Sequence, residues 1–259
     1  MQYGQTGSGK TYTMSGKDLT DIDPVAKPND NNGIIPRSLS YIFEKIDHFQ
    51  EDGGTTTDWT IGASYYEIYN ENVYDLLQWD AIALQVKWDP GQGFHIPELH
   101  IQPCNTLHDV RAVLGIGNRR RRSRSHAMNA ESSRSHTVFT LYIASSFGED
   151  AIRTTQSSKL VFVDLAGSER LKDSCADSTA SIKETANINK SLFMLGKVIS
   201  ALASGLQGPL IPYRESKLTK LLIGSTGGPS KYLMIACCSS RYGMPPLPFY
   251  LPIYLFFTT

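Results

Sequence analysis

The chain has 259 residues, of which 41% are hydrophobic and 19% are charged. This length and balance suit one large α/β domain with its own core, and they exclude an intrinsically disordered chain. Lysine plus arginine equals aspartate plus glutamate, with 25 of each, which excludes the global basic charge of a histone-like nucleic-acid binder.

The first predicted element is a glycine-rich loop, "GQTGSGKT", which opens directly into a predicted helix, "KTYTM". Its glycines let successive backbone N–H groups turn inward around phosphate oxygens. Lys10 can reach the β- and γ-phosphates of a nucleotide, and the Thr11 hydroxyl can bind Mg²⁺. An accidental Gly/Ser-rich turn is the structural alternative. The predicted phosphate-binding residues are Gly4, Gln5, Thr6, Gly7, Ser8, Gly9, Lys10 and Thr11.

A polar stretch over 15–32 indicates an exposed loop. Residues 33–49 predict a helix because their apolar positions recur at helical spacing. Residues 59–77, rich in β-branched and aromatic side chains, predict a strand that ends near the polar residues 70–72. Two short strands within 84–103, joined by "PGQG", predict a hairpin. The apolar face of the predicted helix consists of Leu39, Ile42, Phe43, Ile46 and Phe49.

A further helix is predicted from about residue 107 to 116, and the run "RRRRSRSH" follows it. We interpret this run as a solvated helix end with a possible basic surface role. RNA binding is disfavoured because the run is short, lacks interleaved aromatic residues and lies in a chain of zero net charge.

The second half predicts alternating strands and helices. Residues 137–145 and 232–238 predict strands, and the run 159–167 is apolar enough for burial on both faces of a sheet. Helices are predicted over 186–204 and 216–225 from their apolar periodicity. This alternation predicts a central, mixed, mostly parallel sheet with helices on both faces.

Two motifs supply the other groups that a triphosphatase needs. In "VDLAGSER", Asp164 directly follows an apolar strand and would hold a metal-bound water, while the Gly167 N–H would face a γ-phosphate. In "NAESSRSH", Ser132, Ser133 and Arg134 lie in a predicted loop between a helix and a strand. Taken alone, the first motif could be an ordinary turn and the second a solvated loop.

Together these segments resemble the motor domain of the kinesin family. The matching stretches are "YGQTGSGKT", "NAESSRSH", "VDLAGSER", "NINKSLFMLGKVISAL" and "IPYRESKLTKLL", within residues 3–237. The resemblance implies a three-layer P-loop NTPase fold and a microtubule-based motor ATPase that uses ATP and Mg²⁺. The preference for ATP over a guanine nucleotide is implied by the resemblance alone.

The resemblance also implies residue roles. Ser132 and Ser133 would form the first switch, with one of them near the attacking water. Ser133 would bind Mg²⁺ together with Thr11, and Asp164 would bind it through a water. Arg134 and Glu169 would form a salt bridge that links the two switches, and Glu169 would accept a proton through a water relay. Such catalysis works by positioning and electrostatics.

The track-binding surface is likewise implied by the resemblance. The long helix over 187–202 and the segment "PYRESKLTK" would face the microtubule, where a local cationic surface meets an acidic polymer. An ordinary amphipathic helix with a solvated basic face is the structural alternative. The implied contact residues are Asn187, Tyr213, Arg214, Lys217 and Lys220.

The chain departs from the family pattern at both ends. Roughly the first third of a kinesin motor domain precedes the phosphate loop, and a last helix follows the final strand. We therefore expect residues 1–240 to be a partial motor domain that lacks the first strands and last helix, and 241–259 to be an aberrant, proline-rich hydrophobic tail. The alternatives are a non-catalytic microtubule-binding fragment, a non-functional truncated product or, more weakly, a signalling GTPase.

The expected location is the cytoplasm, on the microtubule cytoskeleton. Four cysteines without paired-ligand spacing favour a reducing compartment over a disulfide framework. No membrane partner is expected, because the most apolar stretch, "LPFYLPIYLFF", is too short to span a bilayer and contains two prolines.

Overall fold

The computed structural model describes residues 1–16, 32–51, 58–80, 82–127, 132–147, 154–169, 179–226 and 230–238. Its helices are α1 (Lys10–Ser15), α2 (Ile34–Glu51), α3 (Leu107–Ala127), α4 (Thr179–Ala203) and α5 (Lys217–Thr226). Its strands are β1 (Gln2–Tyr3), β2 (Asp58–Tyr69), β3 (Asn72–Asp75), β4 (Lys87–Asp89), β5 (Gly93–His95), β6 (Gln102–Pro103), β7 (Ser135–Phe147), β8 (Thr154–Asp164) and β9 (Ile235–Ala236). Most of the predicted loop 15–32 and all of the predicted tail 241–259 lie outside the described residues.

The main sheet has the strand order β3-β2-β7-β8-β1-β9, with β6 added beside β2. Strand β2 is antiparallel to β3, β6 and β7, and β7 is antiparallel to β8, whereas β1 pairs in parallel with both β8 and β9. The prediction of a mixed sheet is therefore confirmed, but the prediction that most pairings are parallel is wrong for the described strands. Six residues separate β7 from β8 in the sequence, a length that suits an antiparallel connection and is too short for a parallel crossover.

A second antiparallel connection was not expected from the sequence. The predicted strand over 59–77 does end near residues 70–72, but the chain then turns back as β3 and pairs with β2. Asn70 and Glu71 at the turn both have positive φ, 50° and 58°, as a two-residue hairpin turn requires. The hairpin predicted around "PGQG" is confirmed as β4 paired with β5.

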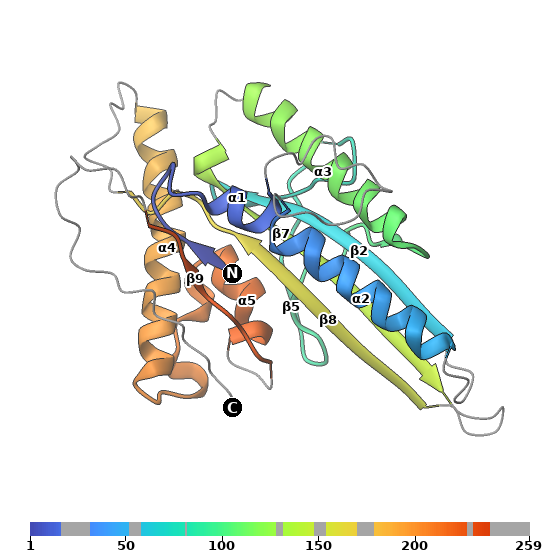
Figure 1. Cartoon of the computed structure of the whole chain (residues 1–259). Helices are drawn as coiled ribbons and strands as arrows, with labels where there is room; N and C mark the ends of the chain where they lie inside the picture. Colours follow the sequence, from blue (N-terminus) through green and yellow to red (C-terminus); the bar gives the residue numbers. More distant parts are fainter. Residues whose placement is uncertain are drawn as a thin grey trace.

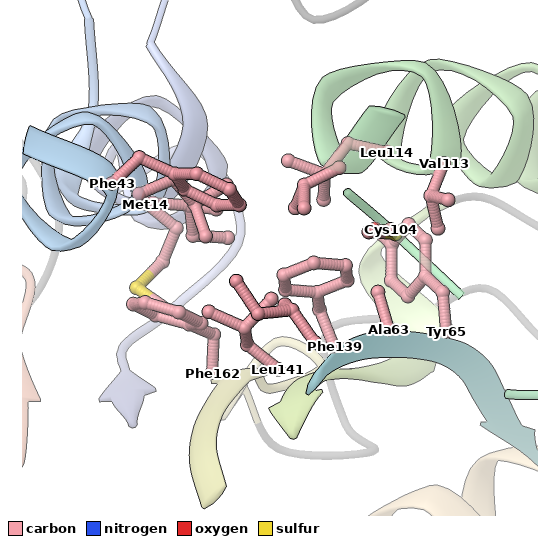
Figure 2. Close-up of a cluster of buried hydrophobic side chains, with 14 of the residues drawn as sticks. Met14, Phe43, Ala63, Tyr65, Cys104, Val113, Leu114, Phe139, Leu141 and Phe162 are labelled. Atoms are coloured by element: carbon pink, nitrogen blue, oxygen red, sulfur yellow. The ribbon is translucent and has the colours of Figure 1, made fainter. Parts of the chain in front are cut away.

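Helices cover both faces of the sheet, as predicted (Figure 1). On one face, α1, α2 and α3 pack on β2, β7 and β8 around Met14, Phe43 and Phe139, as Figure 2 shows. On the other face, α4 and α5 pack through Leu195 and Leu222. Alternation along β2 serves both layers, because Ile61, Ala63 and Tyr65 join the first cluster while Tyr66 and Ile68 join the second.

The predicted apolar face of α2 is mostly confirmed. Leu39, Phe43 and Ile46 are buried, and Ile42 packs partly against the same cluster. Phe49 is 66% exposed, so the apolar face continues beyond the buried cluster at this end of α2. It lies near the end of α2, and the centre of its ring is 6.5 Å from that of Trp59.

The arginine-rich run differs most from its sequence interpretation. Helix α3 continues through this run to Ala127 rather than ending near Ile116. Arg121 is only 8% exposed, so the interpretation of the run as a solvated helix end is wrong at this position. The guanidinium can be buried because the carboxylates of Asp164 and Glu67 lie 3.2 and 3.9 Å from it.

Among the described helices, none is long and apolar enough to cross a membrane.

A glycine sets how closely α3 approaches β2. A Cβ added at Gly117 would overlap the ring of Tyr65, which is buried and donates its hydroxyl to Asn118 Oδ1 at 2.9 Å. We predict that Gly117→Ala lowers the free energy of unfolding by about 1–3 kcal/mol, because a packed aromatic ring has to move. The matched control is Gly196→Ala in α4, where an added Cβ meets nothing within 4 Å and should stabilise slightly. Equal melting temperatures of both variants in thermal unfolding would contradict the prediction.

Candidate functional site

The phosphate loop lies at the end of β1, which runs between β8 and β9. The loop turns at Gly9, whose φ of 88° is in the left-handed region and which caps α1 immediately before Lys10. The Ser8 hydroxyl is buried and has no hydrogen-bond partner among the described residues. A buried donor beside a helix N-terminus suits an anionic group such as phosphate, so these residues fit the nucleotide predicted from the sequence.

Lys10 is the charged group of the loop. Its side chain is only 8% exposed, and Nζ donates to the Gln5 carbonyl at 2.9 Å. Burial lowers the pKa of Lys10 below its ordinary value, and the negative charges of Asp164 and Glu169 oppose this shift. A buried ammonium is stabilised by a nearby anion, so Lys10 fits a phosphate beside it, and its predicted place at the β- and γ-phosphates stays a prediction.

The two predicted metal-site oxygens meet at the start of α1. The Thr11 hydroxyl donates to Asp164 Oδ2 at 3.1 Å. The other carboxylate oxygen of Asp164 accepts a bond from Gln2 Nε2 at 2.5 Å. A hydroxyl and a carboxylate are oxygen ligands of the kind Mg²⁺ prefers, so this corner of the site fits the predicted ion.

Two residues of this corner were missed in the sequence. Gln2 lies in the three residues before the loop and matches no motif, and Arg121 is one of several consecutive arginines. Arg121 NH1 donates to Asp164 Oδ2 at 3.2 Å. Burial by itself lowers the pKa of Arg121. The negative charge of Asp164 is the largest of the effects that oppose burial, and together they raise this pKa above its ordinary value. No local pattern separates Arg121 from its arginine neighbours in the sequence.

Backbone hydrogen bonds connect the two predicted switches to each other and to the loop. The Gly167 N–H donates to the Ser133 carbonyl at 2.7 Å, and the Ser168 N–H donates to the Gly4 carbonyl at 3.1 Å. Ser132, Ser133 and Arg134 form the short 3-10 turn η1 (Ser132–Arg134) just before β7. For the Gly167 N–H to face a γ-phosphate as predicted, its bond to Ser133 has to open.

Glu169 lies against the phosphate loop. Its carboxylate accepts bonds from the Thr6 N–H, at 2.9 Å, and from the Thr6 hydroxyl. Burial by itself raises the pKa of Glu169, but the hydrogen bonds from Thr6 outweigh burial and hold this pKa below its ordinary value. The structure thus places an ionised carboxylate at the loop. The salt bridge between Arg134 and Glu169 stays a prediction.

The predicted track-binding residues divide into exposed and buried members. Arg214 is exposed in the 3-10 turn η4 (Tyr213–Glu215), while Lys217 and Lys220 are half-buried in α5. Lys220 Nζ lies 5.8 Å from the centre of the Phe94 ring on β5. Tyr213 is buried in a cluster with Val198 of α4, so its ring supports this surface instead of contacting a track as predicted. The side chain of Asn187 lies outside the described residues, although α4 includes the position.

Known proteins share this sequence along most of its length. A sequence profile described as the kinesin motor domain matches residues 1–243. The human chromosome-associated kinesin KIF4B is 42% identical over 241 residues, which is 92% of this chain and 19% of that protein. The Caenorhabditis elegans kinesin-like protein klp-20 is 43% identical over 235 residues, 90% of this chain and 34% of that protein. The chain spans less than half the length of these relatives.

A solved structure agrees with the sequence matches. The structure of a fast kinesin superposes with a TM-score of 0.77 and 35% sequence identity, covering 92% of this chain and 63% of that one. This match confirms the predicted P-loop NTPase fold with a mixed sheet between helices. By profile, by sequence identity and by fold, the chain belongs to the kinesin motor domain family.

Proposed function

We propose that this chain carries the nucleotide site and the track surface of a microtubule motor ATPase. The observation that carries the proposal is the contact between the Thr11 hydroxyl and Asp164 at the start of α1, beside the buried Lys10. The family supports it as well, since the solved fast kinesin is described by its ATPase mechanism and its interactions with microtubules. The corresponding location is the cytoplasm, on microtubules.

The residues have separate roles in nucleotide binding. Loop residues 4–11 surround the phosphates with backbone N–H groups, and the charge of Lys10 offsets phosphate charge. Thr11, Ser133 and, through a water, Asp164 hold Mg²⁺. The bound nucleotide supplies the phosphoryl group whose transfer to water is the reaction, and Mg²⁺ neutralises charge on it.

The switch residues control the proton and the attacking water. Ser132 and Ser133 position the water and the metal, and Arg134 pairs with Glu169 when the switches close. Glu169 accepts the proton through a water relay, a role that needs an ionised carboxylate at the site pH, and its lowered pKa supports this. Its present contact with Thr6 keeps the carboxylate next to the loop.

The track surface is built from α4, η4 and α5. These elements lie together on the sheet face opposite α2 and α3 (Figure 1). Arg214, Lys217 and Lys220 supply the positive charge that meets the acidic microtubule surface, while buried Tyr213 packs η4 against α4. Asn187 belongs to the same helix, α4.

Removal of the loop ammonium tests nucleotide binding. We predict that Lys10→Ala weakens MgATP binding by about two orders of magnitude, because phosphate charge then lies beside a buried position that has lost its cation. Calorimetric titration with MgATP measures this directly. The control is Lys45→Ala, an exposed lysine of α2, which should bind as the parent does. If Lys10→Ala bound MgATP with the parental affinity, the assignment of the loop to the nucleotide site would be contradicted.

Removal of the switch carboxylate tests catalysis separately from binding. Glu169→Ala is expected to lower the hydrolysis rate about a hundredfold or more through loss of the proton acceptor, while MgATP still binds. Phosphate release is measured with and without microtubules, with the exposed Glu44→Ala on α2 as the control. Hydrolysis at the parental rate in Glu169→Ala would contradict the assignment, whereas microtubule binding without hydrolysis by the parent would favour the non-catalytic fragment.

The basic surface predicts a salt-dependent affinity. The double variant Arg214→Ala/Lys220→Ala should bind microtubules about threefold to tenfold more weakly at about 0.05 M salt, with a smaller difference at about 0.2 M, because ions screen exposed charges. Cosedimentation with microtubules at both salt concentrations measures the effect. Lys45→Ala, on the opposite face of the sheet, again serves as the control. A salt-independent loss would indicate misfolding of α5 rather than lost charge contacts.

A further inference from the structure

One buried histidine, on the strand that follows the first switch, contacts two further parts of the molecule that the proposed function treats separately. His136 is the second residue of β7, directly after the first switch, and only 2% of it is exposed. Its Nδ1 accepts a hydrogen bond from the Ala166 N–H at 2.9 Å. Ala166 lies between Asp164 and Gly167, so this bond ties the strand after the first switch to the second switch.

The other ring nitrogen reaches helix α4. His136 Nε2 lies 2.6 Å from the Ser191 hydroxyl oxygen, and Ser191 is also only 2% exposed. Because Nδ1 accepts a bond, the ring hydrogen must be on Nε2, which therefore donates to Ser191. A single planar ring thus joins the second switch on one side to α4 on the other.

The protonation state of the ring agrees with this geometry. Burial, with a smaller effect from the positive charge of Arg121, lowers the pKa of His136 to about 3. The ring is therefore neutral at physiological pH and keeps Nδ1 as an acceptor. A neutral ring in one tautomer makes both bonds at the same time.

We propose that His136 is a positioning residue that transmits rearrangement of the second switch to α4 through Ser191. The proposal rests on the proposed function and adds to it the side chain that couples the nucleotide site to the track helix. The Gly167 N–H has to leave the Ser133 carbonyl before it can face a γ-phosphate. The adjacent Ala166 N–H moves with it, and the His136 ring follows to keep its bond.

The ring carries this motion because neither of its bonds is easily given up. Both bonds are buried, and an unsatisfied buried donor or acceptor is costly. Ser191 therefore moves with the ring, and α4, which also packs on the sheet through Leu192 and Leu195, changes its position on the track surface.

Two substitutions break the same bond from opposite sides. Ser191→Ala removes the acceptor on α4, and the side chain changes little in volume. His136→Asn keeps an amide oxygen near the Nδ1 position, which can still accept from Ala166, but is too short to reach Ser191. The control is Ser123→Ala, an exposed serine of α3 whose hydroxyl donates to the Arg119 carbonyl of the same helix.

Three measurements on the whole chain test the proposal: the affinity for a fluorescent ADP, the hydrolysis rate with and without microtubules, and hydrogen exchange of the α4 peptide with and without MgADP. We expect Ser191→Ala and His136→Asn to bind ADP within about twofold of the parent, but to lose about fivefold or more of the microtubule stimulation. The effect of MgADP on α4 exchange should also disappear. The double variant should be no worse than either single variant, because both remove one bond.

The outcomes separate the two proposals. Parental stimulation and a parental exchange response in both variants would overturn the coupling role of His136. An equal loss of ADP affinity and stimulation would overturn it too, since that result describes a structural residue. A parent that binds ADP but shows no microtubule stimulation would overturn the proposed function alone, and the exchange response of α4 would still decide the role of His136.

Discussion

The buried carboxylate of Asp164 is the constraint on which the rest of the site depends. It lies at the end of β8, where β1, α1 and α3 meet, and it contacts Gln2, Thr11 and Arg121. A buried charge is tolerated only when it is paired and hydrogen-bonded. These partners come from parts of the chain more than forty residues away from Asp164. Satisfying one carboxylate therefore fixes the phosphate-loop helix against the sheet and draws the arginine-rich end of α3 inward.

Hydrogen bonds join the segments that the proposed function treats as switches. The segment after Asp164 bonds to the first switch at Ser133 and to the phosphate loop at Gly4, and Glu169 bonds to Thr6. None of these contacts is a packed apolar interface, so each can open without loss of the core. The site combines a packed sheet and helix α1 with segments held by a few polar bonds, an arrangement that suits the proposed switch role.

Strand β7 connects the two helical layers through neighbouring residues. Ser135 faces α3, where its hydroxyl lies 3.5 Å from Arg121 NH2, while His136 faces α4 and bonds to Ser191. Successive side chains of a strand point to opposite faces, so two consecutive residues reach opposite sides of the sheet. Because β7 follows η1 directly, the first two residues after that turn contact the helical layers on opposite faces of the sheet.

The sequence by itself determined the phosphate loop, helices α1, α4 and α5, the β4–β5 hairpin and the family, because these depend on local spacing and short motifs. Only the tertiary structure decided the antiparallel pairing of β2, β7 and β8, the exposure of Phe49, and the burial of Tyr213 and Arg121. Arg121 and its exposed neighbour Arg122 are the same residue type in one helical run, yet only Arg121 lies opposite Asp164. Burial and partnership of this kind depend on which distant residues the fold brings together, and local sequence patterns carry no information about that.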